Sequence, residues 1–378
     1  MGELILHVGM HKTGSSSIQN TLHATRRRHN WRYVDLGAPN ASAAIITAFS
    51  ETPERQNANR KAGLTRQELV PVARKIRYRL ARLLQQAGAI RHPVILSREH
   101  IPLLREHELA AFLRFILERH GGPIRTVCYI RAPRAYMESV FQQHIQGGQS
   151  GFRLERQFPR YRQRYSRLER ALQGARVEYW PFEPAAMPEG CVVRDFCRRL
   201  NLSIDPSEVQ RANESLSLPA IRLLYAHRLY SRATDTGDAS IDFTSLLAAA
   251  LGELSGPRLR LHESATAALL DQNIEQIRWM ERPLGSSLLD EPRRMGADAI
   301  RDEQQLLEFG PSELHWLENQ LAGTDGRLHE LSADPRAVAA AVETLRLKLA
   351  RERRRGIRQM LLRVVRCFPW TPTARRSD

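Results

Sequence analysis

Short apolar runs alternate with longer segments of helical spacing through the first half of the chain. The runs richest in β-branched residues are residues 4–8, 94–96, 126–130 and 177–179. Each has the continuous apolar character of a strand that is buried on both faces of a parallel sheet. Between them, residues 68–86 and 106–119 carry apolar side chains at helical spacing. This alternation is typical of an α/β domain with a parallel sheet, which we expect over roughly the first 185 residues.

The second half of the chain has few strand signals. Helical patterns cover residues 219–231, 264–280, 311–321 and 335–365. The polar segments 51–66 and 232–242 have the composition of loops. We therefore expect three parts, which are an α/β domain over residues 1–220, a mostly helical extension over 221–350 and a basic amphipathic tail over 351–378.

The loop after the first strand has the composition of an anion-binding site. It reads Gly9-Met10-His11-Lys12-Thr13-Gly14-Ser15-Ser16-Ser17. Gly9 and Gly14 allow the backbone to turn sharply and to approach a ligand closely. The serines bring hydroxyl groups to the start of a helix, where free N–H groups and the helix dipole favour negative charge. Lys12 adds a full positive charge, so the loop predicts a site for a phosphate-like group.

A second candidate anion-binding element follows the strand at residues 126–130. Arg131 comes directly after this strand, and Ser139 follows eight positions later on the next helix. An arginine at a strand end and a serine two turns into a helix can converge on one phosphate, because arginine donates in a bidentate fork and serine donates one hydroxyl. We expect Arg131 and Ser139 to act together.

The order of residues in the first loop resembles one enzyme family. A Walker A element has its lysine after the second glycine, whereas here Lys12 precedes Gly14. The order Lys-Thr-Gly-Ser-Ser-Ser at residues 12–17 resembles the 5′-phosphosulfate-binding loop of the sulfotransferase superfamily. The pair Arg131 and Ser139 is similar to the 3′-phosphate-binding element of these enzymes. Weaker similarities lie at residues 177–183 and 213–217, and none lies beyond about residue 220.

This resemblance implies a P-loop-like α/β fold that binds 3′-phosphoadenosine 5′-phosphosulfate as co-substrate, without a metal. The residues implied at the 5′ end are Lys12, Thr13, Gly14, Ser15, Ser16 and Ser17. Arg131 and Ser139 are implied at the 3′-phosphate. The implied reaction moves a sulfuryl group to a hydroxyl of a carbohydrate or glycan by in-line displacement, as in bacterial carbohydrate-directed relatives. Lys12 is expected to assist that step.

Sulfuryl transfer to a hydroxyl requires a base that takes the hydroxyl proton. The strand at residues 94–96 is followed by Ser97-Arg98-Glu99-His100, which places two titratable groups at the carboxyl end of a central strand. Branches of the superfamily use either histidine or glutamate. We favour Glu99 over His100, because a carboxylate beside cationic groups is a common base in such sites. Asp35 ranks third.

Two other functions remain open on the sequence. The same loop could serve a nucleotide-dependent kinase, although Lys12 is misplaced for that class and no acidic residue of the Walker B type follows an apolar strand. The chain could also be a non-catalytic module that binds an anion, a nucleic acid or a membrane surface on the same fold. Nucleotide binding distinguishes the kinase from a sulfotransferase, because a preference for nucleotides that carry a 3′-phosphate favours the sulfotransferase.

The charge of the chain is concentrated in two basic segments. The 378 residues include 57 Lys and Arg against 41 Asp and Glu, a net charge of +16. Residues 153–176 hold eight arginines, but Phe158, Tyr161 and Tyr165 share one helical stripe, which favours a core role for the aromatics and disfavours nucleic acid as the partner. The arginines then form either a solvated face or a channel for an anionic acceptor.

The second basic segment is the C-terminal one. Residues 351–378 hold nine arginines and two acids, with apolar residues interspersed, which predicts peripheral contact with an anionic membrane surface. The alternative is a peripheral helix with a loose tail. No apolar run reaches the roughly 18 residues of a membrane span, and the first residues do not read as a secretory signal, so a cytoplasmic protein with reduced cysteines is expected.

Overall fold

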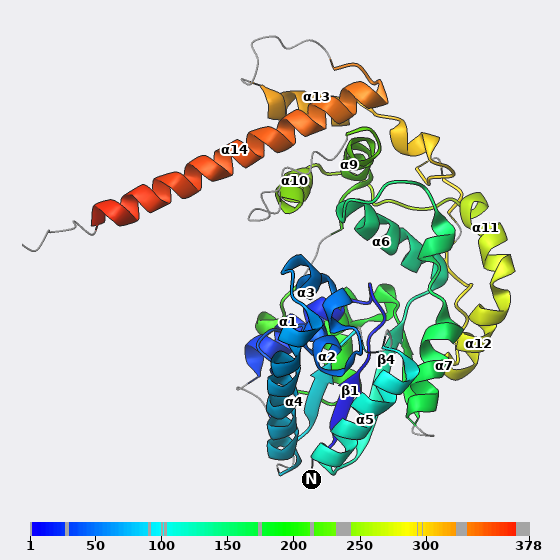
Figure 1. Cartoon of the computed structure of the whole chain (residues 1–378). Coiled ribbons are helices and arrows are strands. Elements are labelled where there is room, and N and C mark those ends of the chain that lie inside the picture. Colours follow the sequence, from blue (N-terminus) through cyan, green and yellow to red (C-terminus); the bar gives the residue numbers. More distant parts are fainter. Residues whose placement is uncertain are drawn as a thin grey trace, which may run out of the picture. The chain divides into compact units, whose positions relative to one another are not determined.

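The computed structural model describes most of the chain (Figure 1). The described residues are 2–26, 30–89, 92–99, 101, 104–172, 176–211, 215–231, 243–292, 294–296, 298–322 and 331–367. The chain forms two compact units that interleave along the sequence. The first unit comprises Met1–Met137, Glu155–Glu214 and Ala267–Pro292, and the second comprises Glu138–Leu154, Ser215–Thr266 and Arg293–Asp378. The predicted boundaries at residues 220 and 350 stay predictions.

The first unit contains a five-stranded sheet in which every pair of neighbours is parallel. From one edge to the other its strands are β2 (Arg32–Tyr33), β3 (Val94–Ser97), β1 (Leu4–His7), β4 (Ile124–Ile130) and β5 (Val177–Pro181). The register pairs His7 with Ser97 on one side and with Val127 on the other, so the loops after β1, β3 and β4 leave the same edge of the sheet. That edge is where open α/β sheets bind ligands.

Helices flank this sheet. Those of the first unit are α1 (Ser15–Thr25), α2 (Ser42–Phe49), α3 (Asn57–Lys61), α4 (Arg66–Gly88), α5 (Glu106–His120), α7 (Tyr161–Ala171), α8 (Val192–Arg199) and α12 (Ile274–Leu284). Helix α6 (Pro133–Gln146) and helix α11 (Glu263–Gln272) each run from one unit into the other. Ile18 of α1 and Phe196 of α8 share a buried core with Ile5 and Tyr129 of the sheet. The 3-10 turns described ahead of residue 215 include η1 (Pro53–Arg55), η3 (Leu154–Gln157), η4 (Pro184–Ala186), η5 (Pro188–Gly190) and η6 (Pro206–Glu208).

The second unit is built around the buried helix α9 (Leu218–Tyr230). It packs against α10 (Phe243–Leu251), α13 (Pro311–Leu321), α14 (Pro335–Cys367) and the turn η7 (Gln304–Leu307). His227 of α9 makes a 2.7 Å contact from Nε2 to the carboxylate of Glu343 on α14, and Arg346 binds the same carboxylate. These contacts fix α14 on α9.

The parallel sheet flanked by helices confirms the predicted α/β class, and the later part of the chain is mostly helical as predicted. All four predicted strands form. Three local predictions are wrong. Phe158, expected on one helical stripe with Tyr161 and Tyr165, precedes α7, which begins at Tyr161, although all three rings are buried as predicted. The segment 51–66 contains η1 and α3, and the single helix expected over residues 264–280 is two helices that break at Asn273. The Asn273 amide donates to the Leu269 carbonyl at 2.8 Å and so competes with the helical hydrogen bonds. The predicted loop at 232–242 lies outside the described residues.

Across the described ranges, each helix is either too short or too polar to cross a membrane.

Candidate functional site

The loop between β1 and α1 is held in a compact turn by its own residues. Lys12 and Gly14 both have left-handed backbones, with φ of 65° and 72°. A Cβ on Gly14 would lie 2.6 Å from Cγ1 of Val192, so glycine is required there for space as well as for φ. The Thr13 hydroxyl donates to the Met10 carbonyl at 2.6 Å. This turn delivers the chain into α1 with no side chain at its N-cap and no acid in its first turn.

Two cations meet at this loop. The Arg131 guanidinium, at the end of β4, donates to the Lys12 carbonyl at 2.7 Å and lies 5.4 Å from the ring centre of Phe182. The Tyr161 hydroxyl donates to the Arg131 carbonyl at 2.6 Å. Burial, followed by the charge of Arg131, holds the pKa of Lys12 below its usual value, and the carboxylate of Glu99 partly opposes this shift. Positive charge is therefore concentrated beside the N-terminus of α1.

A carboxylate lies on the other side of the loop. Glu99 follows β3, and one of its oxygens accepts a hydrogen bond from the Ser15 hydroxyl. Its other oxygen accepts from the Asn40 amide at 3.2 Å. The site thus joins a carboxylate to the serine that opens α1. His100, the second candidate base, lies outside the described residues.

A buried polar cluster packs beneath the loop between β1 and α1, next to Gly9. Nδ1 of His7 lies 2.8 Å from the Ser97 hydroxyl, and the Gln19 amide lies 3.3 Å from the same oxygen. Burial lowers the pKa of His7 to about 4, so its imidazole is neutral near pH 7. Among the described residues, Nε2 of His7 has no hydrogen-bond partner. A Cβ on Gly9 would come within 3.2 Å of that nitrogen, which places the ring directly under the loop.

The other predicted residues have varied surroundings. Ser16 is half-buried and Ser17 is buried in the first turn of α1. Ser139 is half-buried on α6 and belongs to the second unit, so the structure does not place it relative to Arg131. Asp35 is engaged by His23 at 3.2 Å and by Arg26 at 3.1 Å.

Sequence reasoning missed several residues that shape the site. Asn40 holds Glu99 across 59 positions of sequence, and Tyr161 holds Arg131 across 30. Neither pattern is visible along the chain. His7 does carry a signal, because it is a polar residue in the last position of an otherwise apolar strand.

Comparisons with known proteins add little to this geometry. No family model matches the chain, and no curated protein matches it. A search of solved structures finds the sulfotransferase domain from the curacin biosynthetic pathway, at 14% identity over 57% of this chain and 79% of that domain, with a TM-score of 0.32. A likeness this loose carries no argument about the present chain.

The arrangement brings three kinds of functional group together at one edge of the sheet. It offers uncapped N–H groups at a helix start, two cations that face the same loop, and a carboxylate in hydrogen-bond contact with a serine. Such a set can bind a doubly charged anion and accept a proton beside it. These groups come from the segments that follow three neighbouring strands, β3, β1 and β4.

Proposed function

We propose that this protein is a sulfotransferase that moves a sulfuryl group from 3′-phosphoadenosine 5′-phosphosulfate to a hydroxyl of a carbohydrate. The observation that carries the proposal is the meeting of Lys12, Arg131 and Glu99 around the N-terminus of α1. The resemblance of residues 12–17 to a phosphosulfate-binding loop supports the same function.

The donor set fits this co-substrate. Lys12, the N–H groups at the start of α1, and the hydroxyls of Ser15, Ser16 and Ser17 would hold the 5′ end, with Gly14 giving the backbone close access. The Thr13 hydroxyl stabilises the turn by donating a hydrogen bond to the Met10 carbonyl. Arg131 would hold the 3′-phosphate, together with Ser139. The co-substrate supplies the sulfuryl group and leaves as the bisphosphate.

The residues of the chain then have separate tasks. Glu99 accepts the proton of the acceptor hydroxyl as the new S–O bond forms and the bond between sulfur and the phosphate oxygen breaks. Lys12 stabilises the negative charge that grows on the departing phosphate oxygen. Ser15 orients Glu99, because its hydroxyl donates to that carboxylate. Much of the remaining acceleration comes from positioning.

Calorimetry with 3′-phosphoadenosine 5′-phosphate and with ATP tests the donor half of the proposal. The 3′-phosphate compound should bind more tightly than ATP, and Arg131→Ala should weaken it by about 2 to 5 kcal/mol, as for truncation of one side of a buried charge pair. The exposed Arg156, replaced by alanine, is the matched control. Tighter binding of ATP, with no loss in Arg131→Ala, would favour a kinase and overturn the proposal.

Turnover with labelled phosphosulfate donor and a panel of carbohydrates tests the chemical half. Glu99→Gln keeps the size of the side chain but cannot take a proton, so it should lose turnover and retain affinity for 3′-phosphoadenosine 5′-phosphate. If Glu99→Gln turns over at the full rate, Glu99 is not the base. His100→Gln, measured in parallel, then tests the other candidate.

A further inference from the structure

A groove lies in the first unit, apart from the loop after β1. It has a volume of about 560 Å³ and lies between the η3–α7 segment and the α11–α12 segment. One wall is formed by Glu155, Phe158, Arg160, Arg162, Gln163 and Ser166. The opposite wall is formed by Leu269, Gln272, Asn273 and Gln276. Helix α12 packs on α7 and on β5, which fixes the two walls against each other.

Most of the residues that line the groove carry side chains that form hydrogen bonds, and their polar and carbon atoms contribute similar shares of its surface. Gln276 donates to the Asn273 side chain at 2.9 Å, which orients the amide of Gln276. Side-chain amides both donate and accept, and so they match the hydroxyl groups of a sugar ring. Only Phe158 and Leu269 of the lining residues are apolar. The lining therefore suits a ligand that presents both hydroxyl groups and apolar CH faces, as sugar rings do.

Two arginines give the groove a positive balance. Arg160 and Arg162 are exposed, and neither forms an ion pair with a residue that the structure describes. Glu155 is the one carboxylate in the lining. Arginine recognises carboxylate and sulfate groups through two parallel N–H donors. The ligand should accordingly carry anionic groups as well as hydroxyls.

The backbone of Arg160 is held in an unfavourable conformation. It is the N-cap of α7, with φ of 50° and ψ of 51°. A left-handed backbone costs a residue other than glycine roughly 1–2 kcal/mol. Such strain tends to persist at binding sites, where the surrounding structure imposes it. Here it sets the direction in which the chain leaves Arg160, between the buried Pro159 and Tyr161.

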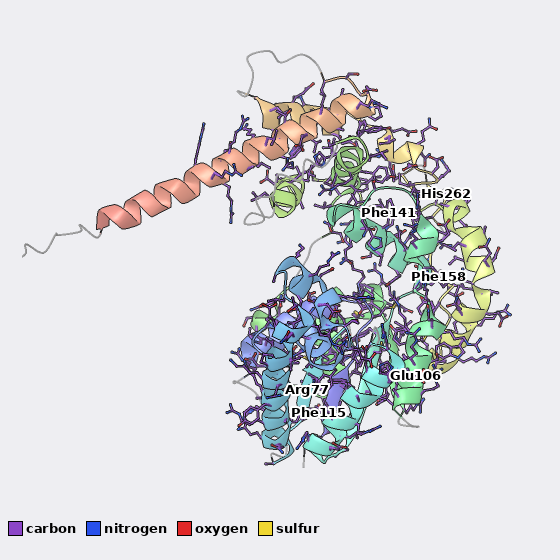
Figure 2. All side chains as sticks on the ribbon, in the orientation of Figure 1. Arg77, Glu106, Phe115, Phe141, Phe158 and His262 are labelled. Atoms are coloured by element: carbon purple, nitrogen blue, oxygen red, sulfur yellow. The ribbon has the colours of Figure 1, made fainter. Side chains whose placement is uncertain are left out.

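The buried residue Tyr161 connects the groove to the candidate donor site. Phe158, labelled near the start of α7 in Figure 2, packs edge-on against Tyr161 with ring centres 6.2 Å apart. Tyr161 in turn donates to the carbonyl of Arg131. A ligand seated against Arg160 thus lies next to Tyr161, the residue that positions Arg131.

We infer that this groove binds an acidic oligosaccharide, a chain of hydroxyl-rich rings that carry carboxylate or sulfate groups, as the acceptor of the reaction. The role as acceptor rests on the proposed function, whereas the binding itself does not. Single-stranded nucleic acid fits less well, because its bases stack on exposed aromatic rings and Phe158 is only 3% exposed. Of the arginines in residues 153–176, Arg160 and Arg162 thus line a channel instead of a merely solvated face.

Calorimetry with a size-defined oligosaccharide of alternating uronate and hexosamine units tests the inference. The double variant Arg160→Ala/Arg162→Ala should weaken binding by about tenfold or more, as expected for lost charge-assisted hydrogen bonds. Arg156→Ala is the matched control, since Arg156 is exposed in η3 but does not line the groove. Gln276→Leu should also weaken binding, and this loss should depend little on salt.

The outcomes separate the groove from the donor site. Equal affinity for a neutral hexasaccharide, tighter binding of single-stranded RNA, or full affinity in the double variant would each overturn the inference. Lys12→Ala should leave oligosaccharide affinity unchanged. If the oligosaccharide binds but 3′-phosphoadenosine 5′-phosphate does not, the groove stands and the proposed function fails. If 3′-phosphoadenosine 5′-phosphate binds but the oligosaccharide does not, the proposed function stands and the inference about the groove fails.

Discussion

At the scale of single residues, Lys12 has the central role in the proposed site, where it stabilises charge on the departing phosphate oxygen. Its ammonium group is partly withdrawn from water and lies near both Arg131 and Glu99. Lys12→Ala should lower turnover on the order of a hundredfold, the scale for losing one preorganised charge donor. Initial rates at saturating donor measure this. Lys12→Arg, which keeps the charge, is the control, and a full rate in Lys12→Ala would remove Lys12 from the mechanism.

His7 gives the protein a specific pH dependence. Its pKa falls from 6.5 to about 4 on folding because the ring is buried. As the pH falls, His7 is protonated in the unfolded chain before it is protonated in the folded protein. The titration of His7 therefore leaves the free energy of unfolding unchanged above about pH 6.5 and lowers it as the pH drops from there to about 4. The loss amounts to about 3 kcal/mol at 1.36 kcal/mol per pKa unit.

Urea unfolding between pH 7 and pH 4 measures this loss in wild type and in His7→Gln. The variant should be less stable at pH 7 but should show a shallower decline, because glutamine does not titrate. The exposed His92, replaced by glutamine, is the control and should keep the wild-type slope. A His7→Gln curve parallel to that of wild type would show that His7 does not titrate as inferred.

At the scale of elements, the start of α1 depends on Gly14. Gly14→Ala should destabilise the protein in two ways, through the left-handed φ of 72° and through the 2.6 Å approach of the new Cβ to Val192. The first effect costs roughly 1–2 kcal/mol. Gly63→Ala is the matched control, since Gly63 has φ of 66° and a Cβ added there would meet no atom within 4 Å.

Chemical unfolding of four variants separates the two effects. Gly63→Ala should show the cost of φ alone, and Gly14→Ala should exceed it by the cost of the clash. Adding Val192→Ala to Gly14→Ala removes the clash, so the double variant should be more stable than the sum of the single changes predicts. Strict additivity would mean that Val192 does not confine Gly14.

The start of α6 has a cap that comes from far along the chain. The Glu291 carboxylate accepts hydrogen bonds from the N–H groups of Arg134 at 3.0 Å and of Ala135 at 2.9 Å. Glu291→Ala should therefore lower the free energy of unfolding by about 1 kcal/mol, the typical cost of losing a helix cap. Thermal and urea unfolding measure it. Glu291→Gln should lose less, because an amide oxygen still accepts; an equal loss in both variants would contradict a capping role.

On the scale of the whole molecule, the sheet was the most predictable part. Its central strands β1 and β3 are buried at every position, and burial on both faces requires a nearly unbroken apolar run. The loops that follow such strands lie at one edge by necessity, and for this reason Lys12, Glu99 and Arg131 could be assigned to one site. What could not be predicted is non-local. The return of residues 267–292 to the first unit, which brings Glu291 to α6, leaves no periodic signal in the sequence.

The basic C-terminal segment continues a helix beyond the part that packs. Buried residues of α14 within its described side chains include Val338, Val342 and Leu345 and end at Ala350, and residues 351–355 are all exposed. In Figure 1 the later half of α14 extends away from α9, α10 and α13 of its own unit. The helical backbone continues to Cys367, while residues 368–378 lie outside the described ranges.

This geometry sharpens the prediction of membrane contact. Nine arginines against two acids over residues 351–378 should attract anionic lipid, at about 1 kcal/mol per basic residue near the surface. Deletion after Arg351 leaves the packed part of α14 intact, and should abolish co-sedimentation with phosphatidylserine vesicles while the unfolding transition is kept. Replacing Arg353, Arg354 and Arg355 with glutamine should weaken binding in a salt-dependent way. Arg336→Gln, at the packed end of the same helix, is the control, and undiminished binding after the deletion would assign the vesicle contact to another surface.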